Sequence, residues 1–211
     1  MGRVELVTGG ARSGKSAFAE GRAVALAAAR GPATVVTYVA TALASDSEME
    51  ARIAHHRARR PAAWHSVEAP MRLAEAVADA CKASDVVLVD CLAVWTANRL
   101  LALGDPEAPD GPSASAWWRD VADLEARLVT ECDGALDAIR NGTEDVVLVT
   151  NEVGLGLVPP TPIGRAYRDL LGRLNQRLAL RADAVHLVVA GFALDLATLA
   201  TPIPQGDDLV R

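Results

Sequence analysis

Five short runs of apolar residues, rich in Val, Leu and Ile, recur along the chain and predict β-strands. The runs cover residues 3–8, 33–40, 85–90, 145–150 and 184–190. Each run is almost continuously apolar, whereas a strand with one face in water alternates apolar and polar residues. The pattern therefore predicts the strands of a parallel sheet that is covered on both faces.

The segments between these runs carry patterns that are typical of helices. Amphipathic or Ala- and Leu-rich stretches occupy residues 15–30, 47–60, 70–82, 117–140 and 164–182. Because strands and helices alternate, the sequence predicts right-handed crossovers in an α/β fold. We expect one domain over residues 1–211, with a mostly parallel central sheet and helices on both faces.

One segment fits neither pattern. Residues 103–118 read LGDPEAPDGPSASAWW, and their content of Pro, Gly, Ser and Asp predicts a loop. This loop is either a lid or a surface insertion without chemistry. Trp117 and Trp118, at its end, are expected to begin the next helix or to pack the loop down.

Composition and charge narrow the classes of function. The formal net charge of the 211 residues is -6, and an acidic surface argues against a general nucleic-acid binder. The three cysteines, Cys81, Cys91 and Cys132, lie far apart and fit neither a zinc site nor a disulfide framework, which favours a reducing compartment. No apolar run reaches about 18 residues, and the first run leads directly into a glycine-rich loop. The sequence thus predicts a cytoplasmic protein with no membrane span and no signal peptide.

A glycine-rich segment after the first predicted strand carries the strongest chemical signal. The stretch GGARSGKS fits the phosphate-binding pattern G-x-x-x-x-G-K-[ST]. Glycines let the backbone curl so that N–H groups point at phosphate oxygens, and the following helix adds its positive end. Lys15 is expected to reach the β- and γ-phosphates, and Ser16 to bind Mg²⁺. The predicted nucleotide-binding residues are Gly9, Gly10, Ala11, Arg12, Ser13, Gly14, Lys15 and Ser16.

An acidic partner for Mg²⁺ is expected at the end of a neighbouring strand. Asp90 ends the run VVLVD, which is the place where a phosphate-loop protein holds its metal. An Asp at a strand end also occurs simply as the cap of the following helix. With the glycine loop present, the sequence favours the metal role.

Two adjacent histidines lie in a segment that is rich in arginine. Four arginines flank His55 and His56, namely Arg52, Arg57, Arg59 and Arg60. Adjacent helical residues point about 100° apart, so the two rings do not easily share one role. Alone, the segment is typical of a solvated basic helix face. Beside a nucleotide-binding loop, a neutral imidazole among guanidinium groups also suits nucleophilic attack on phosphorus.

Taken together, the motifs resemble a known family. The stretches LVTGGARSGKS, YVAT, EMEARIAHHRARRP, VTNEVGLGLVP and GRLNQRLA occur in this order. They resemble the bifunctional adenosylcobinamide kinase / adenosylcobinamide-phosphate guanylyltransferase family from about residue 4 to residue 190. The glycine loop alone would not separate this family from other kinases.

The resemblance implies a P-loop, RecA-like α/β domain and two consecutive reactions. The family phosphorylates the aminopropanol hydroxyl of adenosylcobinamide with ATP or GTP, and then transfers GMP from GTP onto that phosphate. The products are adenosylcobinamide-GDP and pyrophosphate, in the assembly of the cobalamin nucleotide loop. In the family the second reaction passes through a GMP-histidine intermediate on the first histidine of the pair, which is His55. Family members assemble as homotrimers.

The same resemblance implies further residues at the nucleotide. They come from the AT that closes the second strand, from the residues just after the nucleophile, and from two acidic residues. In this sequence they are Ala40, Thr41, Ala42, His56, Arg57, Ala58, Arg59, Glu68 and Asp90. Some relatives carry Glu where this chain has Asp90, and either carboxylate can serve a metal or a ribose.

The stretch that begins with TNEVG is expected to line the other side of the cleft. Asn151 and Glu152 follow the fourth predicted strand, and the carboxyl ends of strands are where α/β proteins bind ligands. Three arginines farther on either hold phosphates or form salt bridges to a neighbouring subunit, and the sequence leaves both roles open. They are Arg165, Arg168 and Arg173.

Two other functions stay open from the sequence. One is a nucleotide-binding switch without catalysis, and the other is a small-molecule kinase without guanylyl transfer. Only the guanylyltransferase would acquire acid-labile covalent label from α-labelled GTP.

Overall fold

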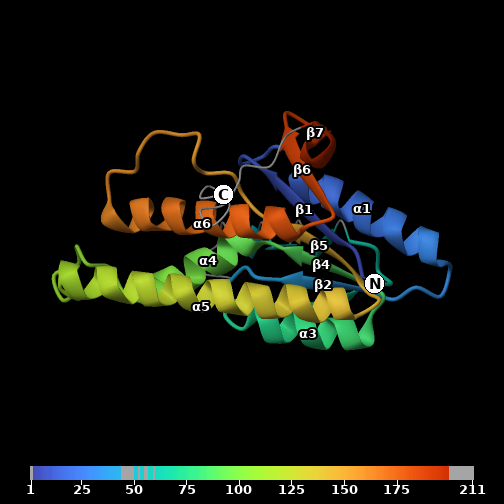
Figure 1. The fold of residues 1–211 in the computed structure, drawn as a ribbon, viewed down its shortest axis with the longest axis horizontal. Coiled ribbons are helices and arrows are strands. Elements are labelled where there is room, and N and C mark those ends of the chain that lie inside the picture. Colours follow the sequence, from blue (N-terminus) through green and yellow to red (C-terminus); the bar gives the residue numbers. More distant parts are fainter. Residues whose placement is uncertain (1, 44–49, 52, 55–56, 59, 200–211) are drawn as a thin grey trace, which may run out of the picture.

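The computed structural model describes residues 2–43, 50–51, 53–54, 57–58 and 60–199. Within these residues a seven-stranded sheet has the order β3-β2-β4-β5-β1-β6-β7 (Figure 1). Neighbouring strands are parallel except the antiparallel pair β6 and β7, so the predicted mostly parallel sheet is confirmed. The strands are β1 (Val4–Gly9), β2 (Val36–Ala40), β3 (His65–Glu68), β4 (Val86–Asp90), β5 (Asp145–Val149), β6 (Ala184–Val189) and β7 (Phe192–Asp195).

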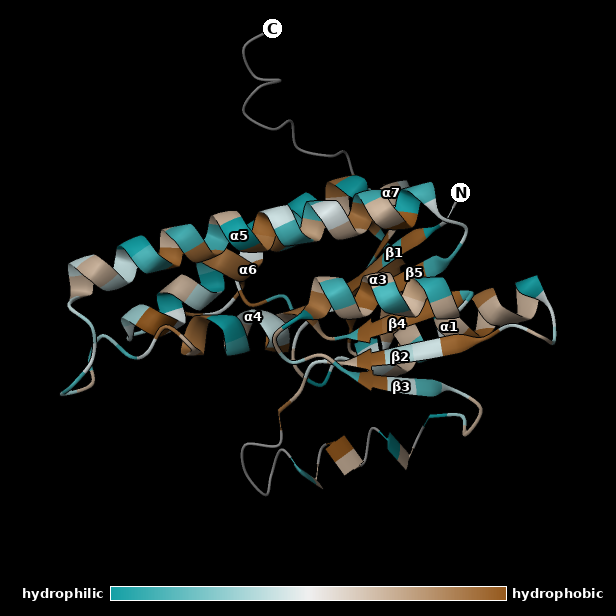
Figure 2. Ribbon diagram, turned by 90° about the horizontal axis from the view of Figure 1, so that it is seen from below, coloured by the Kyte–Doolittle hydropathy of each residue, from teal (hydrophilic) through white to brown (hydrophobic). Residues whose placement is uncertain are grey.

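Helices cover both faces of the sheet. Helix α1 packs on one face, and helices α3, α5 and α6 pack on the other (Figure 1 and Figure 2). Helix α4 follows β4 directly and extends past the sheet beside the first halves of α5 and α6. No helix in the described part of the chain is long and apolar enough to cross a membrane. The helices are α1 (Lys15–Arg30), α3 (Leu73–Ala83), α4 (Leu92–Leu101), α5 (Ala114–Asn141), α6 (Pro162–Arg181) and α7 (Leu196–Leu199).

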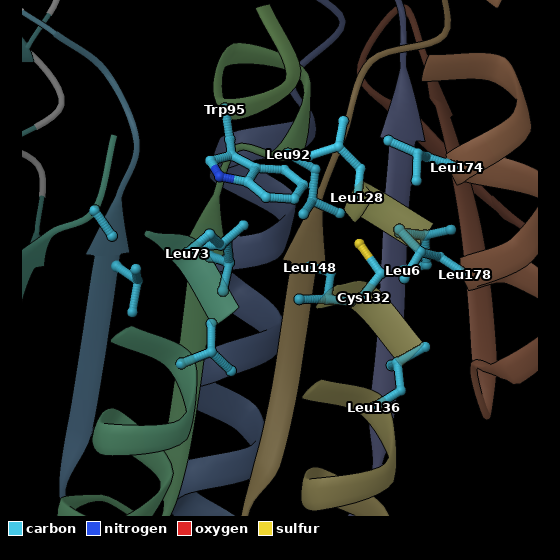
Figure 3. Packing of buried hydrophobic residues seen from close by; sticks show 14 of the residues in the cluster. Leu6, Leu73, Leu92, Trp95, Leu128, Cys132, Leu136, Leu148, Leu174 and Leu178 are labelled. Carbon is cyan, nitrogen blue, oxygen red and sulfur yellow. The ribbon is translucent and has the colours of Figure 1, made fainter. Parts of the chain in front are cut away.

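The larger core lies between the sheet and helices α3, α5 and α6. Figure 3 shows Leu6 of β1 and Leu148 of β5 in this core, together with Leu128 of α5 and Trp95 of α4. Trp95 is 1% exposed, and its Nε1 donates to the carbonyl oxygen of Met71 at 2.9 Å. Burying a large aromatic side chain contributes about 3 kcal/mol, so Trp95 fastens α4 at the sheet edge where the strands end.

Charged side chains link α6 to α5 along their exposed sides. Arg173 of α6 donates to Glu125 of α5 at 2.7 Å, and Arg177 donates to Asp133 at 2.8 Å. Arg181 reaches the same Asp133 at 3.1 Å. Exposed pairs of this kind contribute about 0.2–1 kcal/mol each, so they align the two helices more than they hold the fold together.

A buried carboxylate lies in β1, an inner strand of the sheet. Glu5 of β1 is fully buried and receives two hydrogen bonds of 2.7 Å from the guanidinium group of Arg22 in α1. Arg3 lies 2.9 Å from the same carboxylate, and His186 of β6 lies 3.6 Å from it. Burial alone would raise the pKa of Glu5, but these groups, Arg22 foremost, hold it below its usual value. The ion pair therefore ties α1, which begins at the glycine loop, to β1.

We expect Arg22→Ala to lower the free energy of unfolding by about 2–4 kcal/mol, because it leaves Glu5 buried with weaker partners. The lowered pKa of Glu5 stabilises the native state above the carboxyl's unfolded pKa, and this contribution is lost as pH falls through the lower folded value. The stability difference between the wild type and the variant should therefore be largest near pH 7 and become smaller as pH falls towards 3. Urea unfolding between pH 7 and pH 3 measures both effects. Arg127→Ala, at an exposed position of α5, is the control and should change little.

The sequence pattern does not predict two strands and two helices, namely β3, β7, α4 and α7. All four residues of β3 are exposed, so this edge strand lacks the apolar run that marks a buried one. Strand β7 turns back through Ala190 and Gly191, whose φ angles of 50° and 84° fit a two-residue hairpin turn. Helix α4 starts at Leu92, and only Cys91 separates it from β4, so the sequence has no loop residues there that would indicate the start of a helix.

The predicted loop over 103–118 is wrong at its C-terminal end, because α5 begins at Ala114. Ser113 caps the helix by accepting a hydrogen bond from the N–H of Ala116 at 3.4 Å. Trp117 lies within α5, is fully buried, and donates from Nε1 to the carbonyl oxygen of Gly104 at 2.9 Å. Trp117 thus belongs to the helix and also packs the loop against it.

Candidate nucleotide-binding site

The glycine loop joins β1 to α1 at the carboxyl end of the sheet. A Cβ atom on Gly9 would lie 2.3 Å from the carbonyl oxygen of Val188 in β6, so only glycine fits there. Gly14, just before the helix, has a φ of 98°, which glycine adopts without strain. The sequence therefore builds a tight turn that ends at a helix N-terminus, the arrangement that binds phosphate.

Neighbouring segments hold this loop in place. The N–H of Gly191, in the turn between β6 and β7, donates to the carbonyl oxygen of Ser13 at 2.9 Å. The N–H of Glu152, after β5, donates to the carbonyl oxygen of Gly9 at 3.1 Å. The backbone of Glu152 therefore contacts the loop, while its predicted place in the lining of the cleft stays a prediction.

Lys15 is the first residue of α1, and its side chain lies along the loop. Its Nζ donates to the carbonyl oxygen of Gly10 at 3.2 Å. The ammonium group also acts electrostatically on the thiol of Cys91, just after β4. Burial and the charge of Asp90 nevertheless raise the pKa of Cys91 to about 12, so this thiol stays neutral and is not a nucleophile. The phosphate loop and the end of β4 therefore form one site.

Several of the predicted residues stand in one row across the sheet edge. Ala40 of β2 is the register partner of Glu68 in β3 on one side and of Asp90 in β4 on the other. Asp90 is in turn opposite Val149 of β5, which is opposite Val7 of β1. Neighbouring strands are about 4.8 Å apart, so the backbones of Glu68 and Asp90 lie about 10 Å apart. The structure brings these predicted residues together with the loop at one edge.

The carboxylate of Asp90 is oriented by the neighbouring strand. The hydroxyl of Tyr38 in β2 donates to Asp90 Oδ2 at 2.9 Å. Burial and the charge of Asp90 raise the pKa of Tyr38, so the hydroxyl remains a donor. The guanidinium carbon of Arg60 lies 3.3 Å from the centre of the Tyr38 ring and covers it. Tyr38 thus orients the carboxylate of Asp90, and Arg60 of the arginine-rich segment packs on the Tyr38 ring.

Thr41, which is predicted to contact the nucleotide, also has a structural role. Its side chain is fully buried, and its Oγ1 donates to the carbonyl oxygen of Cys91 at 2.7 Å and accepts from the N–H of Cys91 at 2.9 Å. Asn98 of α4 donates to the carbonyl oxygen of Thr41 at 2.9 Å. These bonds lock the end of β2 to the end of β4. The nucleotide contact predicted for Ala40, Thr41 and Ala42 stays a prediction.

The segment with the histidine pair is described only in part. Arg57 and Ala58 are helical and exposed, as are several of their described neighbours between residues 50 and 58. Arg57 forms an ion pair with Glu68, at the end of β3. This contact brings the segment to the same row as Ala40 and Asp90. The predicted residues His55, His56 and Arg59 lie outside the described residues.

The three arginines of the following stretch are engaged within the chain. Arg165 donates to the carbonyl oxygens of Pro159 and Pro160 at 3.2 Å and 2.6 Å, and so shapes the loop before α6. Arg168 lies 3.0 Å from Asp169. Arg173 takes part in the pairs between α5 and α6. These bonds within the chain do not test the two roles left open for the arginines, phosphate binding and a salt bridge to a neighbouring subunit, which stay predictions.

The donor set at this edge fits a magnesium ion. Asp90 ends β4 and Ser16 lies in the first turn of α1, and both offer the oxygen ligands that Mg²⁺ prefers. Among the described residues, no three His, Cys, Asp or Glu side chains gather in one place. An ion would thus rest on one or two protein oxygens and on nucleotide phosphates, as is usual for Mg²⁺.

Sequence reasoning missed the residues that support this site. Tyr38 stands within an apolar run and looks like an ordinary core residue. Asn98 lies in α4, a helix that the sequence pattern does not predict, and Asn175 lies in the stretch GRLNQRLA, whose local pattern gives no sign of its partners. Each of them acts on a segment more than 20 residues away, so a local pattern carried no signal for it.

Known proteins resemble the chain over most of its length. Residues 5–196 match the family model CobU, described as cobinamide kinase / cobinamide phosphate guanyltransferase. The chain is 41% identical over 191 residues to the bifunctional adenosylcobalamin biosynthesis protein CobU of Salmonella typhimurium and 40% identical over 191 residues to that of Escherichia coli, with 90% of this chain and 98% of each relative covered. It is 42% identical over 192 residues to the bifunctional adenosylcobalamin biosynthesis protein CobP of Pseudomonas aeruginosa, with 91% of this chain and 96% of the relative covered. The chain therefore belongs to the CobU family of cobinamide kinases and cobinamide phosphate guanyltransferases.

Proposed function

We propose that the protein phosphorylates adenosylcobinamide with ATP or GTP and then transfers GMP from GTP to adenosylcobinamide phosphate. The observation that carries this proposal is the placement of a complete phosphate loop and Asp90 at one sheet edge, in the same row as Ala40 and Glu68. Membership of the CobU family supports the two consecutive reactions.

In the first reaction the loop binds the triphosphate and Lys15 stabilises the charge that develops on the β- and γ-phosphates. Ser16 and Asp90 would hold Mg²⁺, which neutralises charge on the phosphate oxygens when bound. Tyr38 keeps one oxygen of Asp90 in a fixed direction. The hydroxyl of adenosylcobinamide then attacks the γ-phosphorus in line with the bond that breaks.

In the second reaction His55 is the nucleophile at the α-phosphorus of GTP. Its imidazole forms a bond to phosphorus, the bond from the α-phosphorus to the bridging oxygen breaks, and the electron pair leaves with pyrophosphate. The phosphate of adenosylcobinamide phosphate then takes GMP from the histidine. Arginines favour a neutral imidazole before the attack, because nearby positive charge disfavours protonation. The ion pair of Arg57 with Glu68 supports the location of this segment beside the nucleotide.

Incubation with GTP labelled at the α-phosphate tests this function. We expect covalent label on the protein and pyrophosphate in solution, and transfer of the label to adenosylcobinamide phosphate when it is added. A nucleotide-binding switch or a kinase without guanylyl transfer would acquire no covalent label, and that result would reject the proposal.

The stability of the label with pH identifies the linkage. A phosphoramidate on histidine is lost in acid, because a protonated imidazole is a better leaving group, and it persists in alkali. The isolated, denatured adduct should therefore release its label quickly at low pH and slowly at high pH. An adduct that survives acid would point to an ester and exclude histidine.

Assembly as a homotrimer and a cytoplasmic location stay part of the proposal. Two residues of the loop between β5 and α6, Leu155 and Leu157, are 90% and 96% exposed, which supports an interface at this loop. Light scattering of the purified protein measures the oligomeric state, and a monomer at micromolar concentration would reject the trimer.

A further inference from the structure

The residue after Thr150, at the carboxyl end of β5, occupies a central place in the site. In the sheet order, β5 lies between β4, which ends at Asp90, and β1, which leads into the glycine loop. Val149 is opposite both Asp90 and Val7. Asn151 is two residues beyond Val149, as Gly9 is two residues beyond Val7, so Asn151 lies level with the start of the loop.

The direction of the Asn151 side chain follows from the strand. Side chains alternate between the two faces of a sheet. Val149 packs on the α1 face, and the hydroxyl of Thr150 points to the opposite face, where it donates to Oδ1 of Asn175 in α6 at 2.8 Å. Asn151 therefore returns to the face of α1, whose first residue is Lys15.

The backbone around Asn151 is held from two sides. Asn175 donates from Nδ2 to the carbonyl oxygen of Asn151 at 2.9 Å. The next residue, Glu152, donates its N–H to the carbonyl oxygen of Gly9 at 3.1 Å. The backbone that bears the Asn151 side chain is thus held by hydrogen bonds, between the glycine loop and the end of β4.

The amide oxygen of this side chain lacks a hydrogen-bond partner among the residues that the structure describes. Oδ1 of Asn151 is buried and has no hydrogen-bond partner in the described part of the chain. A buried acceptor without a donor is costly and calls for an explanation, and a substrate that supplies the donor is one. The aminopropanol hydroxyl of adenosylcobinamide is such a donor, since it must stand close to the γ-phosphate to react.

From this placement we infer that Asn151 is a catalytic residue of the kinase reaction, whose amide oxygen accepts a hydrogen bond from the attacking hydroxyl. This inference rests on the proposed function. The hydroxyl oxygen forms a bond to the γ-phosphorus, and the bond from the γ-phosphorus to the bridging oxygen breaks. The electron pair leaves with the nucleoside diphosphate, and the hydroxyl proton passes to water. Asn151 orients the attacking oxygen and takes no proton.

The test compares Asn151→Ala with the wild type in two reactions. Loss of an orienting contact should lower kcat for phosphorylation of adenosylcobinamide about 10²-fold. The KM for GTP and the covalent GMP labelling, which needs no acceptor hydroxyl, should change less than threefold. Asn151→Asp keeps an acceptor of the same shape and should recover part of kcat at saturating GTP, while its added charge raises the KM for GTP. Asn141→Ala, the same substitution at an exposed residue at the end of α5, is the control and should behave as the wild type.

Unchanged kcat for phosphorylation in Asn151→Ala would overturn the inference. So would a parallel loss of phosphorylation and GMP labelling, since that would mean that Asn151 holds the nucleotide or the fold. Thermal unfolding of each variant separates the last two roles. If the wild type itself does not phosphorylate adenosylcobinamide, the proposed function fails. The inference about Asn151 is tested only when the wild type is active, by comparing the variant with it.

Discussion

Lys15→Ala should lower the rate of adenosylcobinamide phosphorylation about 10³-fold, because it removes a fixed positive charge from the transferred phosphate. In the structure the ammonium group lies along the loop and bonds to the carbonyl oxygen of Gly10, and among the described residues it makes no hydrogen bond to a distant part of the fold. The thermal midpoint should therefore stay close to that of the wild type. Single-turnover kinetics at saturating nucleotide measure the chemical step directly.

The chain offers a matched control for this variant. Its one other lysine, Lys82, lies in the last turn of α3. Its side chain is 76% exposed and pairs only with Asp79 within the described residues. Lys82→Ala should leave both reactions unchanged. Phosphorylation at the wild-type rate by Lys15→Ala would show that the glycine loop is not the kinase site.

His55→Ala should abolish covalent GMP and guanylyl transfer and leave phosphorylation of adenosylcobinamide measurable. The reason is that the imidazole forms a bond to phosphorus only in the second reaction, so the first loses at most an indirect contribution. Labelling with α-labelled GTP and a separate kinase assay on the same preparation measure the two effects.

Substitutions of two other histidines serve as controls for this prediction. His56→Ala should reduce labelling much less, since adjacent helical positions face different directions. His65→Ala, at the exposed start of β3, should have no effect. Peptide mapping that finds the label on His56, or a fully labelled His55→Ala protein, would contradict the assignment of the nucleophile.

The parts of the fold that could be predicted are those whose signal is local. The five buried strands have contiguous apolar runs, and the glycine loop is a contiguous motif between a strand and a helix. The proximity of Ala40 and Asp90 could also be predicted, because the carboxyl ends of parallel strands lie at the same edge of the sheet. Strand β3 was not, because its four exposed residues pair with β2 on one side only and need no apolar run.

The supporting residues of the site could not be predicted, because their partners are distant in sequence. Tyr38 reaches Asp90 across 52 residues, and Asn98 reaches Thr41 across 57. Neither the chain order nor the residue types record such pairings, which exist only once the strands are aligned. The site residues drawn from the family resemblance, His55 among them, await the experiments above.

The order of the strands also determines when the site can form. Strand β1 is made first by the ribosome, yet its two neighbours in the sheet, β5 and β6, are made near the end of synthesis. Arg3 bonds to Asp145 and Val4 bonds to Asp183, contacts that span 142 and 179 residues. At about 5–20 residues per second, the emerging phosphate loop waits for many seconds without the strands that shape it. Nascent chains should therefore bind nucleotide only after β6 has left the ribosome, and the loop-closure entropy of such distant pairings predicts slow refolding of the complete chain.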